Sequence, residues 1–215
     1  MTAIPEKETL RYLGATAADD PALLSQVREL CAQMEQRITP KSIWREFPCE
    51  VTEEGVSFGG VTFAGKDLAR HLKGCSSLLL FAATLGSEAD RMARMERVRS
   101  MTRGAIVHAA GAAMIEQFCD DTQNALEKEY EEKGLFLRPR YSPGYGDLAL
   151  EQQTVFFRLL ELEKRLGLSL SEHYTMTPSK SVTAVIGISP EQKKSFRKCL
   201  LCRKTDCPFR REGSP

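Results

Sequence analysis

The chain has little of what would make its function obvious. Only 7% of its 215 residues are aromatic, with a single tryptophan, and the formal net charge is +1. A chain so close to neutral is unlike a dedicated nucleic-acid binder or an acidic solvating tail. The longest apolar run, residues 78–83, is far shorter than the roughly 20 residues that cross a bilayer. With no internal repeat or low-complexity segment, the sequence indicates one domain that buries a substantial core.

Further absences bear on chemistry and compartment. The three histidines, His71, His108 and His173, are scattered and have no metal-ligand spacing. No glycine-rich phosphate loop and no hydrolase-like serine or cysteine constellation is present, so we expect no independent active site. The first eight residues lack the basic and apolar regions of a signal peptide. We therefore expect a cytoplasmic protein whose seven cysteines are reduced thiols or metal ligands rather than disulfides.

The N-terminal half predicts a helix, a group of strands and two further helices. Asp20 is expected to cap a helix that runs to residue 38, with Pro21 at its first position. Residues 42–63 predict short antiparallel strands, 66–72 a brief helix, and 76–83 a buried central strand. A helix capped by Ser87 should follow. Its expected buried stripe comprises Met92, Met95, Val98 and Met101.

The C-terminal half predicts a long helix over residues 103–132, whose alanine- and glycine-rich first half should lie in the core. An amphipathic helix is expected from residue 147 or 148 until Gly167. Residues 173–189 predict a β-hairpin that turns at 178–180, and Pro190 should cap a closing helix. These elements predict an α+β fold, a twisted antiparallel sheet packed with several helices. The expected organisation is an N-terminal helical extension (1–40), a main domain (41–190) and a basic cysteine-containing tail (191–215).

The segment 138–147 (RPRYSPGYGD) is the most informative stretch of the chain. Its two prolines and two glycines exclude a helix and disfavour a central strand. Arg140 and Tyr145 flank Ser142 and Gly144, where a backbone can approach a ligand closely. An arginine fork suits a carboxylate, and a tyrosine ring suits a flat or cationic group. The alternative is a proline-rich surface loop with a solvated arginine.

Three motifs follow one another in this region. They are Arg140-x-x-x-Gly144-Tyr145, then L-E-L-E-K-x-x-G-L-x-L-x-E over residues 160–172, then Met176-x-Pro178-x-x-Ser181-Val182. Together they resemble the activation (reactivation) domain of vitamin B12 (cobalamin)-dependent methionine synthase. The resemblance is strongest over residues 138–190 and weaker over 81–132.

The resemblance implies binding of S-adenosylmethionine. In that family the arginine of the R-x-x-x-G-Y motif and its neighbouring backbone hold the ligand, with the tyrosine beside it. The corresponding candidate ligand-binding residues here are Arg140, Ser142, Gly144 and Tyr145. An acidic ligand contact on the preceding long helix has Glu116 as its nearest candidate. Three residues depart from the family: Gly146 and Asp147 follow the tyrosine, and Ile186 occupies the place of a second ligand-contacting tyrosine.

The resemblance also implies a role for the whole chain. The family re-methylates cobalamin whose cobalt has been oxidised to Co(II), using an electron from flavodoxin or a similar donor and the methyl group of S-adenosylmethionine. The catalytic and cobalamin modules are not in this sequence. We therefore expect a stand-alone reactivation component for a separate cobalamin-dependent methionine synthase that lacks its own activation domain, with a flavodoxin-like or ferredoxin-like electron donor. Cobalamin would be reached only through that partner.

The tail supports a second hypothesis. Cys199, Cys202 and Cys207 form a C-x2-C-x4-C pattern, which suits zinc or an iron–sulfur cluster. The alternative function is thus a metal-binding interaction or redox protein that does not bind S-adenosylmethionine, and three reduced cysteines on a basic terminus remain the plainer interpretation. The surrounding lysines and arginines admit a nucleic-acid-binding knuckle, but a single interleaved aromatic, Phe209, disfavours it relative to an acidic protein partner.

Overall fold

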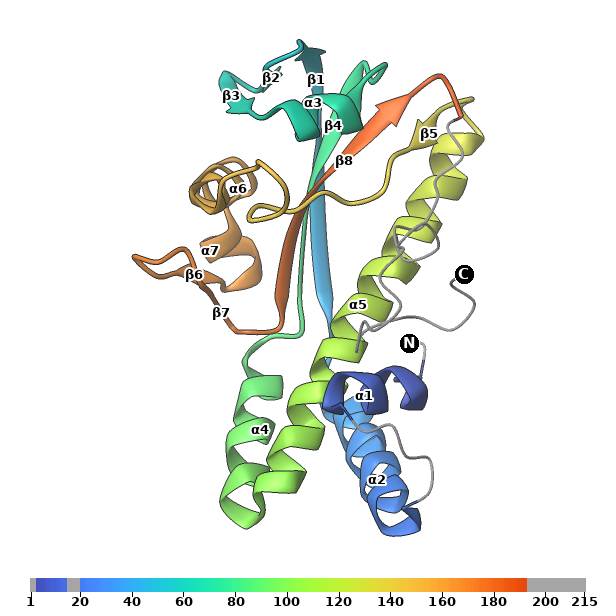
Figure 1. The fold of residues 1–215 in the computed structure, drawn as a ribbon, viewed down its shortest axis with the longest axis vertical. Helices are drawn as coiled ribbons and strands as arrows, with labels where there is room; N and C mark the ends of the chain where they lie inside the picture. The colour runs from blue at the N-terminus through green and yellow to red at the C-terminus, as the bar shows by residue number, and fades with distance from the viewer. Residues whose placement is uncertain (1–2, 15–19, 193–215) are drawn as a thin grey trace.

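The computed structural model describes residues 3–14 and 20–192 (Figure 1). Its centre is a six-stranded antiparallel sheet in the order β3-β2-β1-β4-β8-β5. The strands are β1 (Lys41–Val51), β2 (Gly55–Phe58), β3 (Val61–Ala64), β4 (Ser77–Thr84), β5 (Phe136–Leu137) and β8 (Ser181–Ser189). A separate two-stranded ribbon pairs β6 (Ser169–Leu170) with β7 (Met176–Thr177). The predicted α+β class is confirmed.

Helices cover both faces of this sheet. One face carries α1 (Glu6–Leu13), α2 (Pro21–Arg37), α4 (Ser87–Arg99) and the long α5 (Met101–Glu131), and the other carries α3 (Lys66–Leu72), α6 (Gln153–Leu160) and α7 (Leu162–Leu166). A short 3-10 helix (Leu150–Gln152) precedes α6. The predicted helices at 21–38 and 66–72 are present, and the Asp20 side chain caps α2 by accepting from the N–H groups of Ala22 and Leu23.

Strand β4 is buried on both faces, as its unbroken apolar sequence predicts. Leu79 and Phe81 point into the core under α5, while Leu78 and Leu80 point into the core under α3 and α6. Successive side chains of a strand point to opposite faces of the sheet. Both sets of β4 side chains are buried because helices pack on each face. Helices α1 and α2 bury their apolar residues in the α5-side core as well. The boundary at residue 40 remains a prediction about organisation.

The buried stripe predicted for Met92, Met95, Val98 and Met101 is wrong. Met92 is buried, but Met95 is 42% exposed, Val98 89% and Met101 68%. On α4 a strict three-residue spacing turns about 60° short of a full circle at each step, so Met95 and Val98 rotate away from the core. Met101 begins the next helix, α5. Ser87 is the first helical residue rather than the cap, which is Gly86.

Two predictions in the C-terminal half are also wrong in detail. The helix expected from residue 147 begins only at the 3-10 turn, and it is broken into α6 and α7 at Glu161, whose φ is +53°. The expected hairpin between residues 173 and 189 does not form. Strand β7 pairs with β6, whereas β8 pairs with β4 and β5. The predicted helix after Pro190 lies outside the described residues.

Candidate functional site

The segment after β5 runs beside β8 and contains a bulge. Arg138 donates its N–H to the carbonyl of Gly187, and Tyr141 exchanges both backbone hydrogen bonds with Val185. Two residues of the segment therefore lie opposite one residue of β8, Ile186. Such a bulge re-aims the side chains that flank it.

The bulge directs Arg140 toward α5. Its Nη2 lies 2.6 Å from Asp120 Oδ1 and 3.5 Å from Glu116 Oε2, and its Nη1 donates to Gln123 Oε1 at 3.1 Å. The Arg140 side chain is only 16% exposed, whereas the side chains of Glu116 and Asp120 are each more than 40% exposed. Residues 116, 120 and 123 share one face of α5 because they are spaced four and three apart. The predicted arginine and acidic candidate are thus brought together.

The neighbouring thiol is chemically quiet. Cys119, which directly precedes Asp120 on α5, is fully buried. Burial raises the pKa of its thiol to about 12. The thiol stays protonated at neutral pH, and no nucleophilic role follows from it. The other described cysteines, Cys31, Cys49 and Cys75, likewise form no disulfide within the described residues.

The tyrosine of the motif lies on the other side of the segment. Tyr145 is half exposed, and its ring meets the buried ring of Tyr141 edge-on, with centroids 5.8 Å apart. Tyr141 in turn packs beside His71 of α3. The N–H of Tyr145 bonds to the carbonyl of Ser142, which makes 142–145 a tight turn with Gly144 at φ +83°. Arg140 therefore faces α5, while Tyr145 belongs to the side that carries α3.

Asp147, which departs from the family motif, has a structural role. Its carboxylate accepts hydrogen bonds from the N–H groups of Asp67 and Leu68 at 2.8 and 3.3 Å, at the first turn of α3. The bond from Asp67 is the main reason that the pKa of the Asp147 carboxyl lies below its usual range. Asp147 therefore caps α3 from a distant part of the chain and ties the candidate loop to it.

We expect Asp147→Ala to lower the melting temperature by about 2–4 °C, the usual scale for losing a helix cap in a domain of this size. Asp147→Asn is the matched control, because asparagine also accepts at a helix cap. Thermal unfolding followed by circular dichroism measures both variants. An unchanged melting temperature for Asp147→Ala would show that the loop is held by other contacts.

The third motif, residues 176–182, forms a turn at the start of β8, whereas Tyr141 pairs with Val185 near the middle of that strand. Ser179 donates its N–H and hydroxyl to Asp90 of α4, and Ser181 donates to Thr84 at 2.8 Å. Lys180 Nζ lies 3.3 Å from His108 Nε2, so the ammonium can donate to the neutral imidazole. Burial lowers the pKa of Lys180; burial and the lysine charge lower the pKa of His108.

The two motifs are spaced along one strand rather than gathered in one groove. Tyr141 pairs with Val185, four residues beyond Ser181, which corresponds to about 13 Å of strand. Ile186, at the place of the family's second tyrosine, is fully buried. Sequence reasoning missed Asp120 and Gln123, although their spacing from Glu116 on a helix could have revealed them.

The metal prediction falls outside what the structure covers. Cys199, Cys202 and Cys207 lie beyond the described residues, so the zinc or iron–sulfur hypothesis stays a prediction. Within residues 3–14 and 20–192, no group of three or more histidine, cysteine or acidic side chains is placed to hold a metal ion. None of the helices within these residues combines the length with the apolar character that spanning a bilayer requires.

Comparison with known proteins supports the predicted resemblance. The family model described as "Vitamin B12 dependent methionine synthase, activation domain" matches residues 81–200. Among solved structures, the crystal structure of the MetH reactivation domain bound to AdoHcy is similar, with a TM-score of 0.66 and 16% sequence identity. That match covers 90% of this chain and 76% of the other, and it confirms the predicted fold. The search of curated proteins found no match.

Proposed function

This chain belongs to the family of the vitamin B12 dependent methionine synthase activation domain, and on that premise we propose that it binds S-adenosylmethionine and supports reductive re-methylation of cobalamin. The cobalamin would be held by a separate methionine synthase that lacks its own activation domain. The family assignment supports a methionine synthase as the partner. A flavodoxin-like or ferredoxin-like protein would supply the electron.

The observation that carries the proposal is the charge arrangement around Arg140. Two of its five N–H groups bond to Gln123 and Asp120, which leaves donors in the fork for a ligand carboxylate. Two carboxylates beside one guanidinium leave the cluster with a formal net negative charge. S-adenosylmethionine carries a carboxylate together with two cationic groups, the ammonium and the sulfonium, so both signs in the cluster have a counterpart.

Each residue of the cluster then has a distinct role. Asp120 and Gln123 hold the guanidinium in place, and Arg140 receives the ligand carboxylate. Glu116, the more distant acid at 3.5 Å, faces the cationic part of the ligand. The structural neighbour was crystallised with AdoHcy, the product that remains after S-adenosylmethionine gives up its methyl group. Tyr145 offers an exposed ring for the flat or cationic part of a ligand.

A reconstitution experiment tests the proposal. We expect a synthase that lacks an activation domain, holding oxidised Co(II) cobalamin, to regain methylcobalamin only when this chain, S-adenosylmethionine and a reductant are all present. The absorbance spectrum reports the product. S-adenosylhomocysteine in place of S-adenosylmethionine is the matched control, because it has no methyl group to give. Equal recovery of methylcobalamin without this chain would contradict the proposed role. In isothermal titration calorimetry, the absence of binding heat at millimolar S-adenosylmethionine would contradict the proposed ligand.

A further inference from the structure

We propose that the end of the α4–α5 hairpin, residues 91–103, is a docking surface for an acidic face of the separate cobalamin protein. This inference rests on the proposed function, because the partner that it engages is the one named there. We call residues 91–103 the hairpin end. It combines exposed large apolar side chains with an excess of arginine, and two of these arginines, Arg94 and Arg97, take no part in the ion pairs of the described residues.

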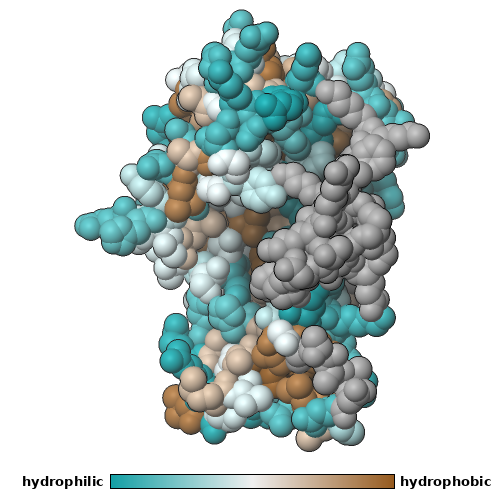
Figure 2. Space-filling model, in the orientation of Figure 1, coloured by the Kyte–Doolittle hydropathy of each residue, from teal (hydrophilic) through white to brown (hydrophobic). Residues whose placement is uncertain are grey.

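The apolar part of the hairpin end is unusual for a solvent-facing surface. Met95, Val98 and Met101 are 42%, 89% and 68% exposed, and brown surface marks this end of the molecule at the lower left of Figure 2. Three of the six exposed large hydrophobic residues in the described part of the chain lie within this short stretch. Exposed apolar surface among polar residues is typical of interaction sites. Methionine in particular adapts its shape to a partner and is enriched in the centres of interfaces.

The charged part of the hairpin end sets the chemistry of the partner. It contains five arginines against one glutamate, Glu96: Arg91, Arg94, Arg97, Arg99 and Arg103. Among the described residues, Arg94 and Arg97 form no ion pair, and both are exposed. Arginine beside methionine is typical of protein interfaces, and a surface of this sign is complementary to an acidic one.

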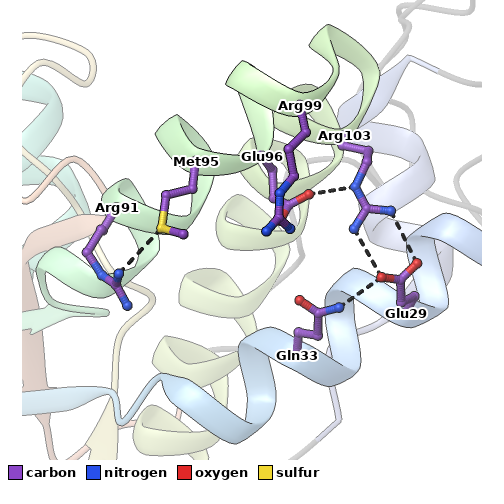
Figure 3. A network of polar contacts seen from close by, with 7 residues as sticks. All are labelled: Glu29, Gln33, Arg91, Met95, Glu96, Arg99 and Arg103. Atoms are coloured by element: carbon purple, nitrogen blue, oxygen red, sulfur yellow. Dashed lines mark hydrogen bonds and ion pairs between the residues drawn. The ribbon is translucent and has the colours of Figure 1, made fainter.

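The hairpin end is held rigidly, which lowers the entropic cost of binding. Figure 3 shows buried Glu96 accepting from Arg103, which reaches on to Glu29 of α2. At Gly104 the two helices are in close contact: a Cβ there would lie 2.7 Å from Arg97 Cβ and 2.8 Å from its Cα. The surface is therefore presented as a preformed platform.

The hairpin end shares one side of α5 with the turn at residues 178–181, and it lies within reach of the ligand site. Met101 and His108 lie on one side of α5 because they are seven residues apart, and Lys180 of the turn reaches His108. Along α5 the hairpin end is about 30 Å from Asp120. A folded domain of ordinary size is on the order of 40 Å across, so one partner could contact both places.

Two variants and one control test the surface. The triple variant Met95→Gln, Val98→Gln, Met101→Gln removes the apolar part, and Arg94→Glu with Arg97→Glu reverses the unpaired charges. Arg158→Glu with Lys164→Glu makes the same charge change on the face that carries α6 and α7. Fluorescence anisotropy measures the Kd of each for the labelled, cobalamin-loaded synthase, and circular dichroism checks that each remains folded.

We expect the apolar triple variant to bind about 10-fold more weakly at every salt concentration. The charge-reversed variant should bind at least about 10-fold more weakly at low salt and approach the wild type as salt screens the surface. The control should bind like the wild type. Wild-type affinity in both test variants would overturn the docking surface and leave the proposed function standing. No binding by the wild type would overturn both, and tight binding of a random DNA duplex that depends on Arg94 and Arg97 would assign the surface to nucleic acid instead.

Discussion

Replacing Glu96 by alanine is expected to destabilise the protein by about 3 kcal/mol, the lower end of the range for breaking a buried ion pair. The Glu96 side chain is 6% exposed and accepts from Arg99 at 2.7 Å and from Arg103 at 2.5 Å (Figure 3). Without it two guanidinium groups face each other across the helix hairpin. The lower end of the range applies because Arg99 is largely solvated and Arg103 keeps Glu29.

Urea unfolding measures this loss, and Glu88→Ala is the matched control. Glu88 also pairs with an arginine three residues further along α4, but that pair, with Arg91, lies near the surface. We expect the control to cost no more than about 1 kcal/mol, as exposed pairs do. Equal costs for the two variants would mean that burial does not set the strength of the Glu96 network.

Replacing Arg140 by alanine is expected to weaken S-adenosylmethionine binding roughly 30- to 150-fold, which corresponds to about 2–3 kcal/mol for a charge-assisted hydrogen-bonded pair. The loss has two origins. The ligand carboxylate loses the guanidinium that receives it. Asp120 and Glu116, which are left without the Arg140 charge, also repel that carboxylate. Isothermal titration calorimetry measures the affinity.

Arg140→Lys separates charge from geometry. A lysine restores the positive charge but not the planar fork, so we expect an intermediate affinity. Arg158→Ala, an exposed arginine on α6, is the control for loss of charge alone and should bind as the wild type does. If Arg140→Ala binds the ligand unchanged, the carboxylate site lies elsewhere on this fold.

The sequence correctly predicted those elements whose residue pattern is compatible with only one kind of local structure. An unbroken apolar run such as that of β4 fits a strand that is covered on both faces, and the Asp20-Pro21 pair fits a helix start. The stripe predicted from Met92 to Met101 was wrong because a three-residue spacing is close to the helical repeat but rotates around the helix axis. The bulge at Arg140 could not be predicted, since it depends on how a segment meets β8, which no local pattern encodes.

The candidate site was predicted in kind but not in arrangement. The motif singled out Arg140 and Tyr145. Because of the bulge between Arg138 and Tyr141, Arg140 contacts α5, whereas Tyr145 packs on the opposite side of the segment against Tyr141. Asp147 looked like a departure from a ligand-binding motif. Its role became visible only with α3, which lies 80 residues earlier in the chain and meets it in space.

The central place of β4 has a consequence for what counts as the unit of this fold. The family match begins at residue 81, in the middle of that strand, and β1 lies before it. A protein cut at the start of the recognisable region would keep half of β4 and lose its neighbour. The exposed strand edge would invite pairing between molecules, and expression of such a fragment would favour aggregates. What sequence comparison recognises is therefore smaller than what must fold together.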